Sequence, residues 1–106
     1  MNHTDYKIAK AFKQKLLENR IPVREVIVFG SRARGDACPD SDLDVLVLLD
    51  WTSFELERLV SHCAWEIGFE VEVIIQTVVM TCQQARESPE KSSLLLLAVE
   101  MEGVSV

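Results

Sequence analysis

The sequence has few cysteines and no arrangement of them that is typical of a zinc site or a disulfide framework. Cys38, Cys63 and Cys82 are odd in number and widely spaced, and they form no CxxC pair or Cys/His ligand pattern. The chain also lacks an apolar run long enough to span a bilayer, and its first residues, MNHTDYK, lack the apolar segment of a signal peptide. We therefore expect free thiols, no membrane partner and a cytoplasmic protein.

Basic residues are in the minority. The sequence has 11 Lys and Arg against 17 Asp and Glu, a formal net charge of −6. Such a chain lacks the broad positive surface that binds duplex nucleic acid or anionic lipid. Apart from Asp5, all the aspartates lie between Asp36 and Asp50, so we expect the acidic groups to bind a cation.

The chain also lacks internal repeats, low-complexity tracts and linkers. Its 106 residues, 48% of them hydrophobic, are enough for one modest core, so we expect a single domain over residues 1–106. Hydrophobic periodicity predicts helices over Thr4–Asn19, Ser31–Arg34 and Ser53–Ile67, and helical pieces after Thr81 that break at Ser88-Pro89 and resume over Ser92–Met101. Strands are predicted over Val23–Phe29, Leu43–Leu49 and Glu70–Val79. This order indicates a small α/β protein with a sheet of three or more strands.

Finer expectations concern the element ends and the core. Thr4 and Thr52 are expected to be N-caps, and Gly68 is expected to follow the second long helix as its C′ residue. The strand Leu43–Leu49 is apolar on both faces, which predicts a central strand covered on both sides. The larger aromatic side chains are expected to fill the core: Phe12, Trp51, Phe54, Trp65 and Phe69.

The segment Gly30-Ser31-Arg32-Ala33-Arg34-Gly35 directly follows a predicted strand. A strand that turns into a short helix at Gly-Ser exposes backbone N–H groups, and glycine lets an anion approach the backbone closely. The hydroxyl group of Ser31 adds a further donor. This segment therefore predicts a phosphate site.

A second segment, Ser41-Asp42-Leu43-Asp44-Val45-Leu46-Val47, opens the next predicted strand. Side chains two residues apart on a strand point to the same face, so the carboxylates of Asp42 and Asp44 can converge on one cation. Two like charges beside an apolar strand are costly to keep ionised, and a bound Mg²⁺ ion removes that cost. The two segments together predict a metal–nucleotide site.

Other phosphate and cation motifs do not fit these residues. A P-loop requires Lys and Ser or Thr where this chain has Asp36 and Ala37. An EF-hand beginning at Asp40 would have Val45 at its glycine position and Trp51 at its last ligand position. The dinucleotide fingerprint GxGxxG is absent from the sequence.

In these two segments the sequence resembles the minimal nucleotidyltransferases of the polymerase-β superfamily, whose pattern is GSxARG, a loop and then SDxDxxV. Both motifs occur in that order between Val26 and Leu49. The resemblance implies a small mixed β-sheet flanked by helices. It also implies a reaction in which a hydroxyl group attacks the α-phosphorus of a nucleoside triphosphate, expected to be ATP. Pyrophosphate leaves, and two Mg²⁺ ions stabilise the charge.

The resemblance also implies roles for individual residues. The β- and γ-phosphates are expected at Gly30 and Ser31, the metal ions at Asp42 and Asp44, and the triphosphate or the acceptor at Arg32 and Arg34. The third carboxylate of the family lies on the next strand. There Glu72 fits best, as a metal ligand and as the base that takes the acceptor's proton, and Glu70 shares its face.

Stand-alone members of this family pair with HEPN-domain proteins in toxin–antitoxin-like modules, so the resemblance implies AMP transfer to a hydroxyl group of a HEPN-type partner. An alternative remains open: an inert nucleotide-binding module that neutralises its partner by covering it. A small hydroxylated acceptor such as an aminoglycoside is a third possibility. The apolar segment Ser93–Val99 further indicates packing in the core, against a partner or against a second copy of the chain.

Overall fold

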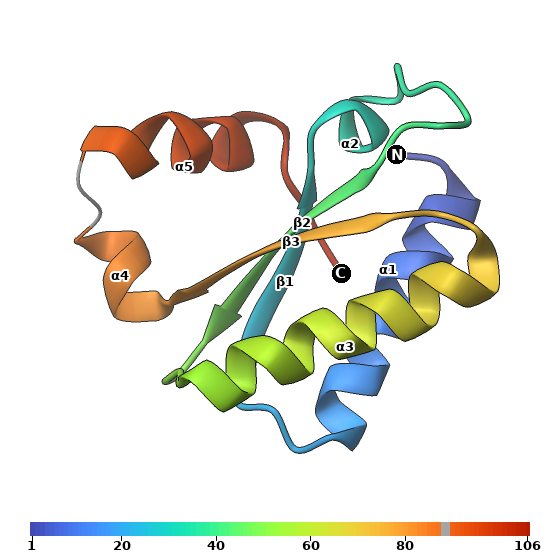
Figure 1. The fold of residues 1–106 in the computed structure, drawn as a ribbon. Helices are drawn as coiled ribbons and strands as arrows, with labels where there is room; N and C mark the ends of the chain where they lie inside the picture. The colour runs from blue at the N-terminus through green and yellow to red at the C-terminus, as the bar shows by residue number, and fades with distance from the viewer. Residues whose placement is uncertain (88–89) are drawn as a thin grey trace.

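A four-stranded mixed sheet forms the centre of the computed structural model, which describes residues 1–87 and 90–106. The strands are β1 (Val23–Phe29), β2 (Leu43–Leu49), β3 (Ile75–Thr81) and β4 (Val104–Ser105), in the spatial order β3-β2-β1-β4 (Figure 1). Strand β2 runs parallel to β3 and antiparallel to β1, and β1 runs antiparallel to β4. The predicted α/β class with a small mixed sheet is confirmed.

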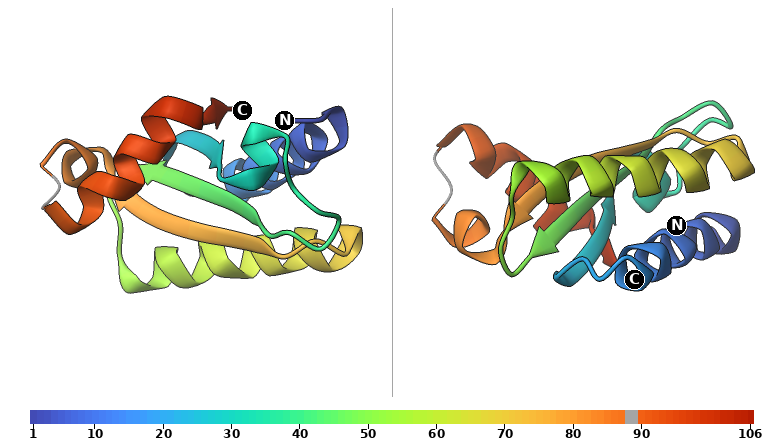
Figure 2. Two further views of the ribbon diagram at one scale, coloured as in Figure 1. Left: turned by 90° about the horizontal axis from the view of Figure 1, so that it is seen from above. Right: turned by 60° about the horizontal axis from the view of Figure 1, so that its bottom comes forward.

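The helices cover the two faces of the sheet unequally. The two long helices, α1 (His3–Glu18) and α3 (Phe54–Val71), lie on one face, whereas α2 (Ser31–Arg34) and α5 (Glu90–Glu102) lie on the other (Figure 2). The short helix α4 (Cys82–Arg86) follows β3 directly. Among the described residues, no helix combines the length and the apolar character needed to cross a membrane.

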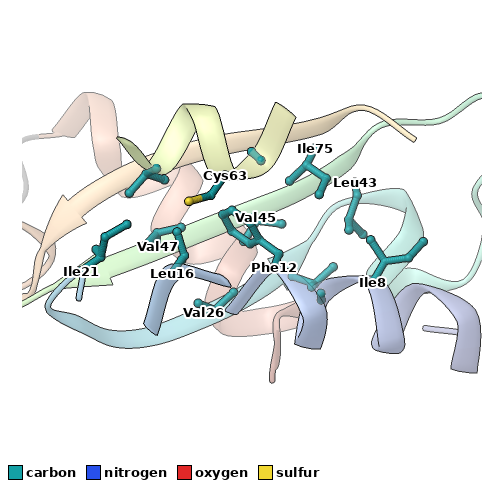
Figure 3. Packing of buried hydrophobic residues seen from close by; sticks show 14 of the residues in the cluster. Ile8, Phe12, Leu16, Ile21, Val26, Leu43, Val45, Val47, Cys63 and Ile75 are labelled. Carbon is teal, nitrogen blue, oxygen red and sulfur yellow. The ribbon is translucent and has the colours of Figure 1, made fainter. Parts of the chain in front are cut away.

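The core lies between the sheet and the pair α1 and α3 (Figure 3). Four alternate side chains of β2 are fully buried in it: Leu43, Val45, Val47 and Leu49. Because side chains alternate along a strand, Asp44 points to the opposite face, toward the side of α2 and α5. Leu46 is buried on that opposite face. Strand β2 is therefore central and covered on both sides, as predicted.

Several predicted element ends are wrong. The N-cap of α1 is Asn2, whose Oδ1 accepts a hydrogen bond from the backbone N–H of Asp5 at 2.7 Å, and Thr4 lies inside the helix. The N-cap of α3 is Ser53 rather than Thr52, because the Ser53 hydroxyl accepts from the N–H of Leu56 at 3.1 Å. The predicted break at Ser88-Pro89 lies outside the described residues.

The predicted strand Glu70–Val79 is wrong at its start. Helix α3 continues to Val71, and β3 begins only at Ile75. Gly68 lies inside α3, where a Cβ atom would collide with the carbonyl oxygen of Val73. The left-handed residue that ends the helix is instead Glu72, with φ of 58°. Gly68 thus serves close packing of the α3–β3 turn, and Glu72 lies in that turn rather than on a strand.

The expectation that the larger aromatic side chains fill the core is correct only for Phe12, which is fully buried. The other four are exposed by more than half of their surface: Trp51 58%, Phe54 74%, Trp65 63% and Phe69 72%. The three on α3 lie on its outer side, because the inner side is occupied by Val60 and Cys63. The aliphatic residues of α3 fill the core in their place.

Candidate active site

The chain turns from β1 into α2 through a single glycine. Gly30 has φ of 80° and ψ of −160°, a backbone conformation that residues other than glycine rarely adopt. Its carbonyl oxygen accepts a hydrogen bond from the N–H of Arg34 at 3.1 Å, so α2 begins immediately at Ser31. The first N–H groups of a helix have no acceptor within the helix. This bend therefore has the backbone form that the sequence predicts.

The carboxylate of Asp44 lies directly against this bend. In the sheet Asp44 is the antiparallel neighbour of Phe29, the residue before Gly30. A Cβ atom at Gly30 would collide with Oδ2 of Asp44. The absence of a side chain at Gly30 is what allows the carboxylate and the backbone of the bend to meet. The structure thus brings together the two segments that sequence analysis assigned to phosphate and to metal.

The surroundings of Asp44 disfavour its ionised form. Partial burial raises the pKa of the Asp44 carboxyl above its ordinary value, and the neighbouring charge of Asp42 raises it further. The guanidinium of Arg34 opposes this rise, and the carboxylate of Glu102 adds to it. Acidic groups therefore gather here with one arginine among them, an arrangement that a cation would stabilise.

Glu102 enters this region from a distant part of the chain. It is the last residue of α5, and its Oε2 lies 2.7 Å from Nη1 of Arg34. The Nε of Arg34 lies 3.1 Å from Oδ2 of Asp36. Figure 2 shows α2 and α5 on the same side of the sheet. Sequence analysis missed Glu102, because only the pairing of β4 with β1 brings the end of α5 beside the bend. In the sequence, the one local feature that marks Glu102 is its position directly before Gly103, a residue type that often ends a helix.

The structure gives Arg32 a different place from the one expected. Its side chain is buried, and its Nη1 lies 2.7 Å from Oδ1 of the equally buried Asp5. Its Nε donates to the carbonyl oxygen of Ser41 at 2.8 Å, and its Nη2 donates to that of Pro39 at 3.0 Å. The expected role in nucleotide binding does not fit these contacts. Arg32 instead fastens the loop before β2 to α1 and α2.

The expected third carboxylate is also displaced. Glu72 is exposed in the α3–β3 turn and lines a groove beside α3, the helix on the sheet face opposite to Asp44. Glu70 is exposed within α3. The β3 residue in register with Asp44 is Gln76. Within residues 1–87 and 90–106, no group of three or more acidic, histidine or cysteine side chains is arranged to hold a metal ion. The predicted trio of Asp42, Asp44 and Glu72 therefore does not form.

The pair Asp42 and Asp44 still suits a magnesium ion. Carboxylate oxygens are the ligands that Mg²⁺ prefers, and this ion is commonly held by one or two carboxylates together with water and substrate phosphates. The raised pKa of Asp44, caused first by burial and then by Asp42, is the electrostatic condition that a divalent cation relieves. The donor set thus fits the ion that the sequence implies.

A family comparison agrees with this geometry. The model of a family described as "Nucleotidyltransferase domain" matches residues 6–98, which include the bend, the acidic pair and all of β3. The chain belongs to this family. The resemblance to minimal nucleotidyltransferases that the two motifs indicated is confirmed.

Curated relatives of this nucleotidyltransferase are mostly much longer than the chain. A bifunctional uridylyltransferase/uridylyl-removing enzyme of Ralstonia nicotianae is 28% identical over 107 residues, which cover 92% of this chain and 12% of the relative. A Methanocaldococcus jannaschii protein that bears the name of a protein adenylyltransferase is 29% identical over 65 residues, 58% of this chain and 65% of the relative. The chain thus spans a small part of the first and just under two thirds of the second.

Solved structures with the same fold include toxin–antitoxin assemblies. A toxin–antitoxin complex with AMP-PNP matches with a TM-score of 0.67 at 20% identity, covering 92% of this chain and 70% of that one. A tri-AMPylated Shewanella oneidensis HEPN toxin in complex with MNT antitoxin matches with a TM-score of 0.63 at 18% identity, covering 95% and 70%. A structure named as a minimal nucleotidyltransferase matches at 25% identity and TM-score 0.57 over the full length of both chains.

Replacing Gly30 with alanine is expected to damage the site and the fold together. The backbone conformation alone costs a non-glycine residue about 1–3 kcal/mol, and the new Cβ must displace the Asp44 carboxylate. Urea unfolding should show the loss of stability, and titration with Mg²⁺–nucleotide should show weaker binding. Gly35→Ala is the matched control, because Gly35 also has positive φ, 84°, but nothing lies within 4 Å of an added Cβ. If both variants bind nucleotide equally well, the contact between bend and carboxylate is irrelevant to binding.

Proposed function

We propose that this nucleotidyltransferase moves AMP from ATP to a hydroxyl group on a partner protein and releases pyrophosphate. The observation that carries the proposal is the contact between the carboxylate of Asp44 and the Gly30 bend within a nucleotidyltransferase domain. In this proposal the Asp44 carboxylate binds metal and the adjacent backbone of the bend binds phosphate. In this proposal the partner protein supplies the acceptor hydroxyl group.

Each residue of the site has a defined task in this reaction. Asp42 and Asp44 hold Mg²⁺, two ions as the resemblance implies, and the bend at Gly30 and Ser31 binds the phosphates of ATP. Bound magnesium supplies positive charge that offsets the charge of the triphosphate. Arg34 lies within reach of the same charges, as its effect on the pKa of Asp44 indicates, and it pairs with phosphate oxygens when the nucleotide is present.

The chemical balance of the transfer is simple. The acceptor oxygen forms a bond to the α-phosphorus, and the bond from that phosphorus to the oxygen bridging to the β-phosphorus breaks. The acceptor proton leaves to a base, and pyrophosphate departs with the electron pair of the broken bond. The alignment of acceptor and phosphate within one site provides much of the acceleration in transfers of this kind.

A HEPN-domain protein is the proposed partner. The support comes from structures of the same fold, which include a toxin–antitoxin complex with AMP-PNP and an AMPylated HEPN toxin with its MNT antitoxin. The protein from Methanocaldococcus jannaschii that bears the name of a protein adenylyltransferase supports AMP as the transferred group. In this proposal the chain acts as an antitoxin that modifies its toxin.

One observation favours a second candidate, an inert module that neutralises its partner by covering it. The β3 position in register with Asp44 holds Gln76, an amide that neither ionises nor takes up a proton at neutral pH. A site with two carboxylates rather than three has no assigned base. In this second candidate the chain binds nucleotide and partner without transferring AMP.

Transfer with labelled ATP separates these candidates. The purified chain is incubated with Mg²⁺, a purified HEPN-domain protein and ATP labelled in either the α- or the γ-phosphate. Transfer of AMP is expected to label the partner from α-labelled ATP and to leave it unlabelled by γ-labelled ATP. Labelling from the γ-position would indicate a kinase-type transfer and contradict the proposal. Neutralisation of the toxin without any label would establish the covering module instead.

A further inference from the structure

The outer side of α3 carries a continuous stripe of side chains that the fold leaves uncovered. Its members follow one another at spacings of three or four residues, which places them on one side of a helix. We call this set the outer stripe: Phe54, Arg58, Ser61, Trp65, Phe69 and Glu72. The opposite side of α3 packs into the core through Val60, Cys63 and Ala64. The aromatic members of the outer stripe therefore point away from the molecule.

The exposed aromatic side chains have close neighbours along the helix. The rings of Trp65 and Phe69 stack with their centroids 5.3 Å apart, and the guanidinium of Arg58 lies 5.9 Å from the ring centre of Phe54. Aromatic side chains have only two side-chain dihedral angles, so they lose little conformational entropy when they are covered. A contiguous exposed apolar surface of this kind marks an interaction site.

Two hollows flank Trp65 on this side of the molecule. One, of about 660 Å³, lies toward the α3–β3 turn and is lined by Trp65, Phe69, Glu72 and Ile74, among others. The second, of about 580 Å³, lies toward the start of α3 and is lined by Phe54, Arg58, Ser61 and Trp65, among others. Each hollow therefore adjoins one exposed aromatic ring besides Trp65, which is Phe69 in the first hollow and Phe54 in the second.

We propose that the outer stripe is the interface of a homodimer, in which α3 of one copy packs antiparallel against α3 of the second copy about a two-fold axis at Trp65. A two-fold interface requires a self-complementary surface. About such an axis, a residue a given number of positions after Trp65 lies opposite the residue the same number before it in the second copy. With the axis at Trp65, the residues that come to lie opposite one another are complementary in both shape and charge.

The charge match comes from Arg58 and Glu72. Arg58 lies seven residues before Trp65, roughly 10 Å along α3 at 1.5 Å per residue. Glu72, the C-cap residue directly after α3, lies seven residues after Trp65, on the other side of the axis. Arg58 of one copy therefore lies opposite Glu72 of the other, and the pair occurs twice in the dimer. The shape match comes from Phe69 and Ser61, four residues on either side of Trp65. The ring of Phe69 faces the small Ser61 of the second copy and enters the second of its two hollows, which Ser61 lines together with Phe54.

Charge exchange across the interface provides the test. The full chain and its variants are compared by sedimentation velocity over a range of concentrations. The wild type is expected to dimerise, and Trp65→Glu is expected to weaken dimerisation at least about 30-fold, as for a central interface aromatic residue. Arg58→Glu and Glu72→Arg each place like charges opposite one another twice, so each is expected to weaken it about 10-fold or more. The double variant R58E/E72R is expected to restore it.

The control is Glu70→Arg, a charge reversal on the same helix at an exposed residue outside the outer stripe, and it is expected to leave dimerisation unchanged. All the substituted residues are exposed and lie on α3 or at its C-cap, and circular dichroism should show unchanged helix content. A monomeric wild type would overturn the proposal, as would a dimer that survives Trp65→Glu or a double variant no better than the single ones. A monomer that binds a HEPN-domain protein through Trp65 would assign the outer stripe to that partner instead.

Discussion

The variant Asp44→Asn is expected to lose at least about 10³-fold in AMP transfer while remaining folded. Loss of the groups that merely support metal ligands costs about 10–100-fold, so loss of a ligand itself costs more. The measurement is the rate of label transfer from α-labelled ATP to the partner at saturating Mg²⁺. Asp40→Asn is the matched control, because it makes the same chemical change at an exposed residue of the loop that precedes β2. Equal rates for the two variants would remove Asp44 from the site.

The same substitution is expected to raise thermal stability at neutral pH. Burial and the charge of Asp42 raise the pKa of the Asp44 carboxyl from its ordinary value of 3.8. Between that value and the raised value the folded state binds more protons than the unfolded state, so the stability of the wild type falls as pH rises through this window. Asparagine does not ionise, so the Asp44→Asn variant does not lose this stability as the pH rises. Added Mg²⁺ should stabilise the wild type but not Asp44→Asn, and melting curves with and without Mg²⁺ at neutral pH test both statements.

Breaking the buried ion pair between Arg32 and Asp5 is expected to cause the largest loss of stability. The two side chains are 9% and 4% exposed and lie 2.7 Å apart, so removal of one partner leaves a charge buried without its counterion. Such changes cost about 3–5 kcal/mol, a large part of the stability of a domain this small. Arg32→Met and Asp5→Leu are therefore each expected to lower the melting temperature by more than about 10 °C.

The double variant R32M/D5L separates stability from positioning. It removes both buried charges, and such replacements by apolar residues are often neutral for stability. The hydrogen bonds from Arg32 to the carbonyl oxygens of Ser41 and Pro39 are still lost, and these hold the loop that precedes Asp42. We expect recovered stability together with weakened Mg²⁺–nucleotide binding. If binding recovers along with stability, the loop does not depend on Arg32.

The centre of the candidate site could be predicted from the sequence because its signals are local. Its geometry depends on a few neighbouring residues: a glycine after an apolar strand, a short helix, and two aspartates at alternate positions. The structure places Asp44 against Gly30 through the antiparallel pairing of β1 with β2. The bend proposed to bind phosphate and the acidic pair could be named without knowledge of distant contacts.

The third carboxylate could not be predicted in the same way. The alternation of Val71, Glu72 and Val73 resembles a strand, and Gly68 resembles a helix end. The helix nevertheless passes through Gly68, because this glycine lets the returning chain at Val73 pack closely against it. That contact moves the start of β3 to Ile75 and places Gln76 beside Asp44. Two competing local patterns were compatible with the sequence, and a tertiary contact selected one.

For helix α3, too, the sequence predicts the element but not which of its sides faces the sheet. Its sequence contains two apolar stripes, one of small side chains that includes Val60 and Cys63 and one of aromatic side chains that includes Trp65 and Phe69. Periodicity predicts a helix from either stripe and does not say which one faces the sheet. In the structure Val60 and Cys63 are buried in the core, and the rings of Trp65 and Phe69 remain exposed.

The sequence by itself determined the α/β class, the central position of β2, and the meeting of a phosphate-type bend with an acidic pair, because these depend on residues close together in the chain. The tertiary structure alone decided that Arg32 is an internal tether, that Glu72 lies away from Asp44's face of the sheet, that Glu102 reaches Arg34, and that an aromatic stripe is left uncovered. The physical reason is that each of these depends on free energies of packing between segments far apart in the chain, which no local pattern records.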